Sequence, residues 1–252
     1  MAYFTVEVKP LVPASTQHAG AFAAGDLLFD WFGFEIPRGG AKLVGVTALV
    51  RPKGDAGPTP NNFGFDLIFG KVGTSLGTGN AVAFLTTPQE DILGSVNIAT
   101  SNFTGPDSAV PTSCTSVASV SGVDMVISPN VTALNTGVNV GYDKFYVAGI
   151  ANGAIDFTSA THVIAADTVV DPTITVDGTG ANLVEQFIAG DVIQLGNAIT
   201  GAAADVVMGT VASITSATAL ELTANSANAS KDGSIIYNQN PIKLLLHFEK
   251  QK

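Results

Sequence analysis

The sequence predicts an all-β protein: an antiparallel, jelly-roll-like β-sandwich with an inserted small β-barrel. Short apolar runs alternate with breaks rich in Gly, Asn, Ser and Pro along the whole chain, as in strands joined by tight turns. The 3.6-residue period of amphipathic helices is almost absent. The clearest stretch is Phe187–Leu222, where strand-length runs and Gly-rich turns follow one another as they do in a small barrel.

About eight strands are expected before residue 151. Each run is rich in β-branched or aromatic residues and is bounded by Pro, Gly or polar breaks. The runs are Tyr3–Val8, Leu27–Ile36, Lys42–Arg51, Phe63–Val72, Val82–Thr86, Ile92–Ala99, Val117–Ile127 and Gly141–Ala151. A loop is expected at Ser15–Gly25, and a short helical turn at Pro88–Asp91.

The run Leu27–Ile36 is heavily aromatic. Period-two alternation places four of its side chains on one face: Leu28, Asp30, Phe32 and Phe34. Trp31 is expected to anchor the core from the other face.

The second half of the chain predicts the inserted module. Its strands are expected at Asp191–Leu195, Val206–Ile214 and Ala219–Thr223, and small polar linkers lie at Asn152–Ala160 and Ala224–Gly233. We therefore expect residues 1–157 and 234–252 to form the sandwich and residues 158–233 to form the barrel. The final strand-like segment, Ile235–Phe248, then returns to the sandwich. The alternative is a tandem of sandwich and barrel, with that last strand in the barrel.

Composition excludes several classes of partner. The chain of 252 residues has 21 acidic and 11 basic side chains, a net charge of −10, and no cluster of Lys or Arg, so nucleic-acid binding is not expected. No apolar run reaches the ~18 residues of a membrane-spanning helix, so no membrane partner is expected. The N-terminus lacks the layout of a signal peptide. The single cysteine, Cys114, rules out an internal disulfide.

No motif points to catalysis, a metal or a cofactor. Residues 73–77 match G-x-S-x-G, but the following Thr78-Gly79-Asn80 cannot start the helix that a nucleophile elbow needs, so a Gly-rich hairpin loop is expected. The three histidines, His18, His162 and His247, lack zinc spacing. Three acids flank the first strands of the module, Asp167, Asp171 and Asp177, but without a calcium-loop pattern they are expected to cap turns.

Two stretches carry a resemblance to a known class of proteins. Val8–Lys71 resembles virion structural proteins of marine tailed phages, especially those that infect cyanobacteria. Phe187–Gly196 and Gly209–Ala227 are similar to a small β-barrel module that recurs in phage particle proteins. The resemblance implies a non-enzymatic structural role in the virion, after assembly in the bacterial cytoplasm. It implies no functional residues.

Two roles follow from this resemblance. The first is a capsid decoration or knob protein that binds the major capsid protein or other virion proteins in many copies, as a homo-oligomer such as a trimer. The second is a tail or fibre component in host recognition, with the inserted barrel as the receptor- or glycan-binding module. The chain has neither the repeats nor the heptads of a fibre, which favours the first role.

The expected contact with the particle is the loop Pro52–Asn62. Prolines stiffen this loop, so it loses less entropy on docking than a flexible loop would. The candidate contact residues are Pro52, Asp55, Pro58, Pro60 and Asn61.

Overall fold

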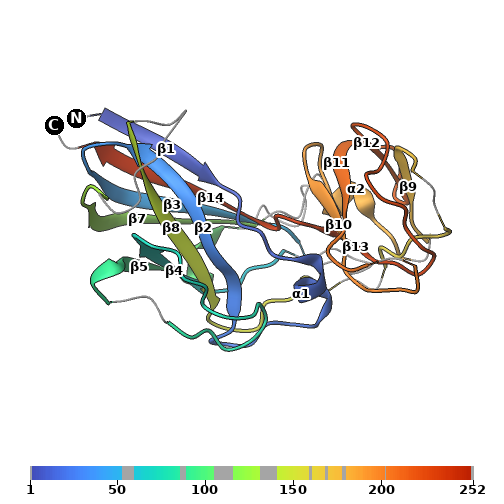
Figure 1. The fold of residues 1–252 in the computed structure, drawn as a ribbon, viewed down its shortest axis with the longest axis horizontal. Coiled ribbons are helices and arrows are strands. Elements are labelled where there is room, and N and C mark those ends of the chain that lie inside the picture. The colour runs from blue at the N-terminus through green and yellow to red at the C-terminus, as the bar shows by residue number, and fades with distance from the viewer. Residues whose placement is uncertain are drawn as a thin grey trace.

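A computed structural model describes residues 2–52, 60–85, 89–104, 116–130, 141–158, 161–167, 170–177, 180–201 and 203–250. It confirms the all-β class: two facing antiparallel sheets form a sandwich, and a third sheet forms a smaller module at one end (Figure 1). The N- and C-terminal ends of the chain lie together at the other end of the sandwich (Figure 1).

The sandwich has the strand order of a jelly roll. The first sheet is ordered β1-β14-β3-β7-β6 and the second β2-β8-β4-β5, and every pairing is antiparallel. The strands are β1 (Ala2–Val8), β2 (Leu27–Pro37), β3 (Ala41–Val50), β4 (Phe65–Gly70), β5 (Ile92–Ile98), β6 (Phe103–Thr104), β7 (Ser116–Ile127), β8 (Tyr142–Ala151) and β14 (Ile242–Lys250). Apart from the β4–β5 hairpin and the short edge strand β6, successive strands alternate between the two sheets, as in a jelly roll.

Strand β14 decides the topology. It pairs with β1 on one side and with β3 on the other, so the last strand of the chain completes the sandwich. This contradicts the tandem alternative, in which that strand belonged to the module. The chain leaves the sandwich after β8, builds the module and returns.

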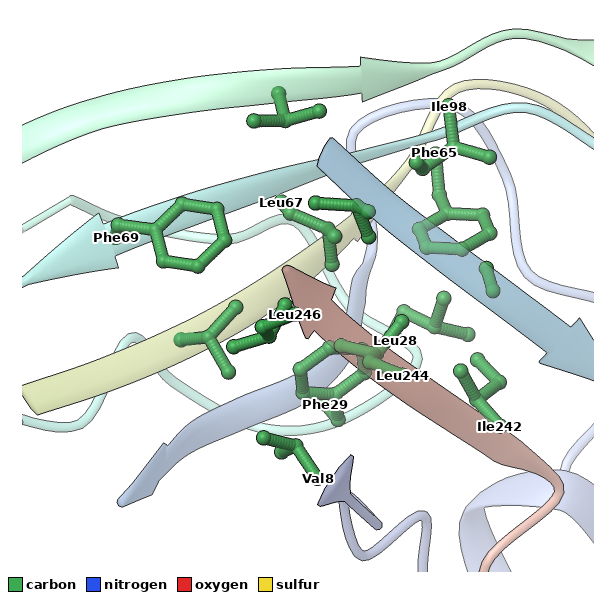
Figure 2. Close-up of a cluster of buried hydrophobic side chains, with 14 of the residues drawn as sticks. Val8, Leu28, Phe29, Phe65, Leu67, Phe69, Ile98, Ile242, Leu244 and Leu246 are labelled. Atoms are coloured by element: carbon green, nitrogen blue, oxygen red, sulfur yellow. The ribbon is translucent and has the colours of Figure 1, made fainter. Parts of the chain in front are cut away.

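The sandwich core follows from period-two alternation. Along β14, Ile242, Leu244, Leu246 and Phe248 are fully buried, while the residues between them face outward. Figure 2 shows Leu244 and Leu246 among side chains of β4 and β2 that come from the opposite sheet. Ring contacts extend this core, with Phe34 and Phe248 stacked at 6.2 Å between centroids. Burial of this continuous apolar layer is the main stabilising term of the fold.

Strand β2 departs from simple alternation. Its pairing with β8 shifts register before and after Phe29, and Leu28 and Phe29 are both buried in the core. Gly149 on β8 makes room for Phe29, because a Cβ there would overlap the ring. Asp30 does not share the inner face with Leu28, since its carboxylate binds residues outside the sheet. The predicted four-residue face is therefore wrong, because a β-bulge rotates the strand within it.

Trp31 packs in a small separate cluster outside the main core. This cluster joins Leu27 and Ala148 of the sheet to Leu76 and Ala83 of the segment after β4. That segment covers the outer face of β2 and β8. A strand was expected at Val82–Thr86, but over the described residues 82–85 only Val82 makes a bridge, to Asp26.

The module is a five-stranded antiparallel sheet ordered β13-β10-β11-β12-β9, with its own apolar core. Its elements are β9 (Thr173–Thr175), α2 (Leu183–Gln186), β10 (Val192–Leu195), β11 (Val207–Ile214), β12 (Ala219–Leu222) and β13 (Ile236–Asn238). Because β13 pairs with β10, the module's sheet continues past residue 233. Val163 and Ile164 bridge to Ile235 and Val176 respectively. The closed barrel remains a prediction.

Short helical elements complete the described chain. Helix α1 (Ala14–His18) lies inside the stretch expected as a loop, and the short 3₁₀ turns η1 (Gln89–Asp91) and η2 (Thr100–Asn102) flank β5. The turn η1 agrees with the one expected at Pro88–Asp91. Neither α-helix approaches the length and hydropathy needed to cross a bilayer, within the described residues.

The end of the sandwich that is remote from the module contains a buried ion pair. Asp143 on β8 is 1% exposed, and Arg38, after β2, places its Nε 3.4 Å from the carboxylate. The arginine side chain is 44% exposed, so solvent screens part of the attraction.

Replacing this arginine should leave the buried Asp143 carboxylate without its ion-pair partner, which costs free energy of folding. We expect Arg38→Met to lower the free energy of unfolding by about 2 kcal/mol, between the values for exposed and fully buried pairs. The double variant Arg38→Met/Asp143→Leu should recover most of the loss, because no charge then remains buried. Urea denaturation of both variants measures this, and equal instability of the two would contradict the ion-pair explanation.

Candidate interaction site at the sandwich–module junction

Helix α1 receives its N-terminal cap from the module. Pro13 precedes the helix and makes no side-chain cap, so the first N–H groups need other acceptors. Asp205, between β10 and β11, supplies one: the Ser15 N–H donates to Oδ1 at 2.7 Å, and the Ser15 hydroxyl donates to Oδ2 at 2.5 Å. The Ala14 N–H donates to Oε1 of Gln194 at 3.3 Å. The module thus caps a helix that lies between the first two strands of the sandwich in the chain.

The backbone of Asp205 is held in a left-handed conformation, with φ at 59°. Few non-glycine residues adopt it, and aspartate and asparagine tolerate it best. Its N–H donates to the carbonyl of Leu195, and its own carbonyl accepts from the Gln194 amide. These bonds fix the carboxylate in the position that caps α1, so the local strain serves the junction.

The far end of α1 is also bound to the module. The Gln17 amide donates to the carbonyls of Val12 and Asn238 at 2.8 Å each, and a ring nitrogen of His18 lies 3.1 Å from the Tyr237 hydroxyl. Gly196 lies beneath this contact. A Cβ at this position would be 3.0 Å from the Ala14 carbonyl oxygen and would overlap the Tyr237 ring. Helix and module therefore pack without space for a side chain between them.

An ion pair joins the two parts on the other side. Arg51 follows β3, and its guanidinium binds Asp191 of the module at 2.6 Å. The side chains of Arg51 and Asp191 are only 15% and 11% exposed, so this pair is better shielded from water than a surface salt bridge. The backbone N–H of Arg51 donates to the Pro241 carbonyl just before β14.

The predicted contact loop Pro52–Asn62 begins at this ion pair. Pro52 is buried against the junction, and the Asn61 amide, 7% exposed, donates to the Arg51 carbonyl at 2.9 Å. Pro60 is exposed. Asp55 and Pro58 lie outside the described residues. The two ends of the loop are thus joined by a hydrogen bond at the base, which lowers the entropy that the loop would lose on docking.

His162 is buried inside the junction. Its ring lies edge-on to Phe187 at 5.5 Å and lines a cavity of about 20 Å³ with Arg51, Gln17 and Tyr237. Burial lowers the pKa of His162 to about 4, because the charged imidazolium would lose its hydration there. At neutral pH the junction therefore holds an uncharged histidine.

The module is much more acidic than the sandwich. Residues 158–233 contain 8 acidic side chains and 1 lysine, a net charge of −7 out of −10 for the whole chain. Of the acids expected to cap turns, Asp171 does so, and Asp167 instead binds residues distant in the chain. Asp171 accepts from the Thr173 N–H at 2.8 Å, and Asp167 binds Lys231 at 2.7 Å, which lowers the pKa of Asp167. The described residues hold no metal-binding group of three or more His, Cys, Asp or Glu side chains.

The remaining sequence motifs have structural partners. The Ser75 hydroxyl of the G-x-S-x-G match donates to Asp30 Oδ2 at 2.6 Å, and the Leu76 N–H donates to Oδ1 of the same carboxylate, which fixes the loop on the sheet. The following residues form a turn and no helix. His247 lies on the outer face of the first sheet, and its two ring nitrogens contact the hydroxyls of Thr5 and Thr47 at 3.1 Å each. Cys114 lies outside the described residues.

No family model, curated protein or solved structure matches this chain.

Acid should destabilise the protein through His162. Its pKa is about 6.5 when unfolded and about 4 when folded, so below pH 6.5 the unfolded state binds more protons than the folded state. We expect the free energy of unfolding to fall by roughly 3 kcal/mol between pH 6.5 and pH 4 from this group, since one pKa unit corresponds to about 1.4 kcal/mol.

The variant His162→Gln isolates this contribution. It removes the titrating ring and leaves all carboxylates in place. The difference in the free energy of unfolding between wild type and variant should therefore change with pH between the folded and unfolded pKa values of His162. Chemical denaturation across this pH range measures it. Parallel pH profiles for the two proteins would contradict the buried-histidine explanation.

The cap on α1 should couple the two parts of the protein. Asp205→Gly keeps the left-handed backbone accessible and removes only the carboxylate, so we expect a loss of about 1–2 kcal/mol, the usual value for a helix cap. Differential scanning calorimetry should then show the module melting earlier than the sandwich. The control Asp171→Gly removes a turn-capping carboxylate within the module, and it should leave the coupling between the parts unchanged.

Proposed function

We propose that this protein is a non-enzymatic structural component of a phage virion that binds the outside of the capsid in many copies. The protein would assemble in the host bacterial cytoplasm, associate as a homo-oligomer such as a trimer, and attach to the major capsid protein or its neighbours. Neither nucleic acid nor a membrane would be its partner. The resemblance of Val8–Lys71 to virion proteins and the jelly-roll strand order support this proposal.

One observation carries the proposal: the anchored base of the Pro52–Asn62 loop. Arg51 is fixed by Asp191 of the module, and its carbonyl accepts from Asn61 at the other end of the loop. These contacts hold the two ends of the loop in the same place in every copy of the protein. Regular attachment to a symmetric particle depends on such uniform, pre-organised contacts.

The clamped module supports the same role. Its contacts with α1 and with Arg51 fix the module relative to the sandwich, so each copy would present two surfaces in a constant geometry. A receptor-binding role in the tail, with the module as the recognition element, is the alternative. Copy number separates the two roles, because a decoration protein is present in many copies per particle and a tail component in few.

Making the Pro52–Asn62 loop more flexible should weaken the attachment of the protein to the particle. Replacing Pro58-Thr59-Pro60 by Gly-Ser-Gly raises the entropy that the loop must lose on docking. We expect about tenfold weaker binding to particles, equivalent to about 1.4 kcal/mol, with unchanged thermal stability. Co-sedimentation of labelled protein with particles that lack it measures this affinity.

A matched control replaces Ser216-Ala217-Thr218, in the β11–β12 turn of the module, by the same Gly-Ser-Gly sequence. This turn is remote from the base of the loop along the chain, and its replacement should not affect attachment. Wild-type occupancy of the loop variant would show that the loop is not the contact. A count of only a few copies, located at the tail, would overturn the decoration role itself.

A further inference from the structure

A shallow polar hollow of about 350 Å³ lies on the second sheet, at the end that faces the module. Three asparagines surround it: Asn62 before β4, Asn97 on β5 and Asn152 after β8. Gly64 and Ala99 also line it. We call this feature the asparagine hollow.

The strand register explains the hollow. Phe65 is fully buried in the core and pairs with both Ala151 and Ile98, so its neighbours in the chain, Gly64 just before β4 and Asp66 within it, face outward. The Gly64 carbonyl accepts from the Asn152 N–H at 3.0 Å, which aligns the two strands. Gly64 just before β4 and Ala99 just after β5 have small or no side chains, so the surface between the asparagines is low.

A side chain at position 64 would be crowded by its neighbours. A Cβ there would lie 3.3 Å from the Ile98 carbonyl oxygen and 3.7 Å from the Asn152 Cβ. The distance to the Ile98 oxygen is shorter than in most real Cβ contacts, and the added methyl group would occupy the bottom of the hollow. The sequence therefore keeps the hollow open at a place where most strand residues would close it.

The hydrogen-bonding groups of the hollow are uncharged. Each carboxamide offers both donors and an acceptor, and Thr100 adds a hydroxyl. Asn97 is fixed, because its amide nitrogen donates to Asp66 at 2.7 Å, and its carbonyl oxygen remains available as an acceptor. No charged side chain lines the hollow among the described residues, and the net charge of −10 disfavours anions.

We propose that the asparagine hollow binds a neutral saccharide. Paired donors and acceptors on β5 and next to the ends of β4 and β8 match neighbouring sugar hydroxyls, which also both donate and accept. The volume lies at the lower end of the range for small-molecule sites, about 300–1,000 Å³, and suits one end of a glycan. This inference stands apart from attachment to a particle, which rests on the loop.

Nuclear magnetic resonance titration of the full chain tests the proposal. The probes are glucose, galactose, mannose and N-acetylglucosamine, each as the monosaccharide and as a linear oligomer, at millimolar concentration. We expect at least one of them to shift the side-chain amide signals of Asn62, Asn97 and Asn152 in a saturable way. A response to oligomers alone points to an extended glycan, and a response to monomers points to one ring.

Variants make the result specific. Gly64→Ala, which fills the floor, and Asn152→Ala, which removes one amide, should each weaken binding about tenfold, the effect of one lost hydrogen bond or a small steric clash. Asn228→Ala on the module is the matched control and should bind as the wild type does. Folding of each variant is checked by its amide spectrum.

Three results would overturn the proposal. The first is no saturable shift with any of the saccharides. The second is a set of shifts confined to the module, which would place the sugar site there. The third is equal affinity in Gly64→Ala, Asn152→Ala and the wild type, which would show that the hollow does not make the contact.

Discussion

The insertion of β14 between β1 and β3 is the constraint on which the rest of the structure depends. A strand that pairs on both sides cannot be omitted, since its four fully buried side chains fill the middle of the core. Because β14 comes last in the chain, the module between β8 and β14 must begin and end at the same end of the sandwich. Only residues Gln239–Pro241 separate the last strand of the module from β14, so the module is held close to the sandwich by its own connection.

This short connection explains why the junction is built from so many polar contacts. Two surfaces forced together must satisfy the backbone groups that they bury. Helix α1 meets this requirement by taking its N-terminal cap from Asp205 and by offering Gln17 to the Asn238 carbonyl. Arg51 then neutralises Asp191 on the other side, where an unpaired buried carboxylate would be costly. The proposed contact loop begins at the same arginine, so the position of its first residues follows from how the module is held.

Much of the fold could be predicted from the sequence, because strand alternation and turn residues act locally. The expected runs Lys42–Arg51, Ile92–Ala99, Val117–Ile127 and Gly141–Ala151 each match an observed strand within a residue. The bulge in β2 could not be predicted, since it depends on the space that Gly149 leaves for Phe29 across the pairing. Helix α1 was missed for a similar reason. Its five residues carry no cap of their own, and the cap comes from a residue 190 positions later. The junction and the asparagine hollow depend on register between distant strands, so no local pattern marks either.

The two proposed binding features share one end of the sandwich, and this limits how they can act. Asn61 closes the base of the contact loop, and its neighbour Asn62 lines the asparagine hollow. A capsid surface docked on the loop would therefore lie next to the hollow and restrict access to it. A glycan bound before assembly would obstruct the same approach. The chain termini lie at the end of the sandwich opposite the module (Figure 1). If both proposals hold, the saccharide and the particle compete for one face of the protein. The saccharide would then bind only copies that are not attached to a particle.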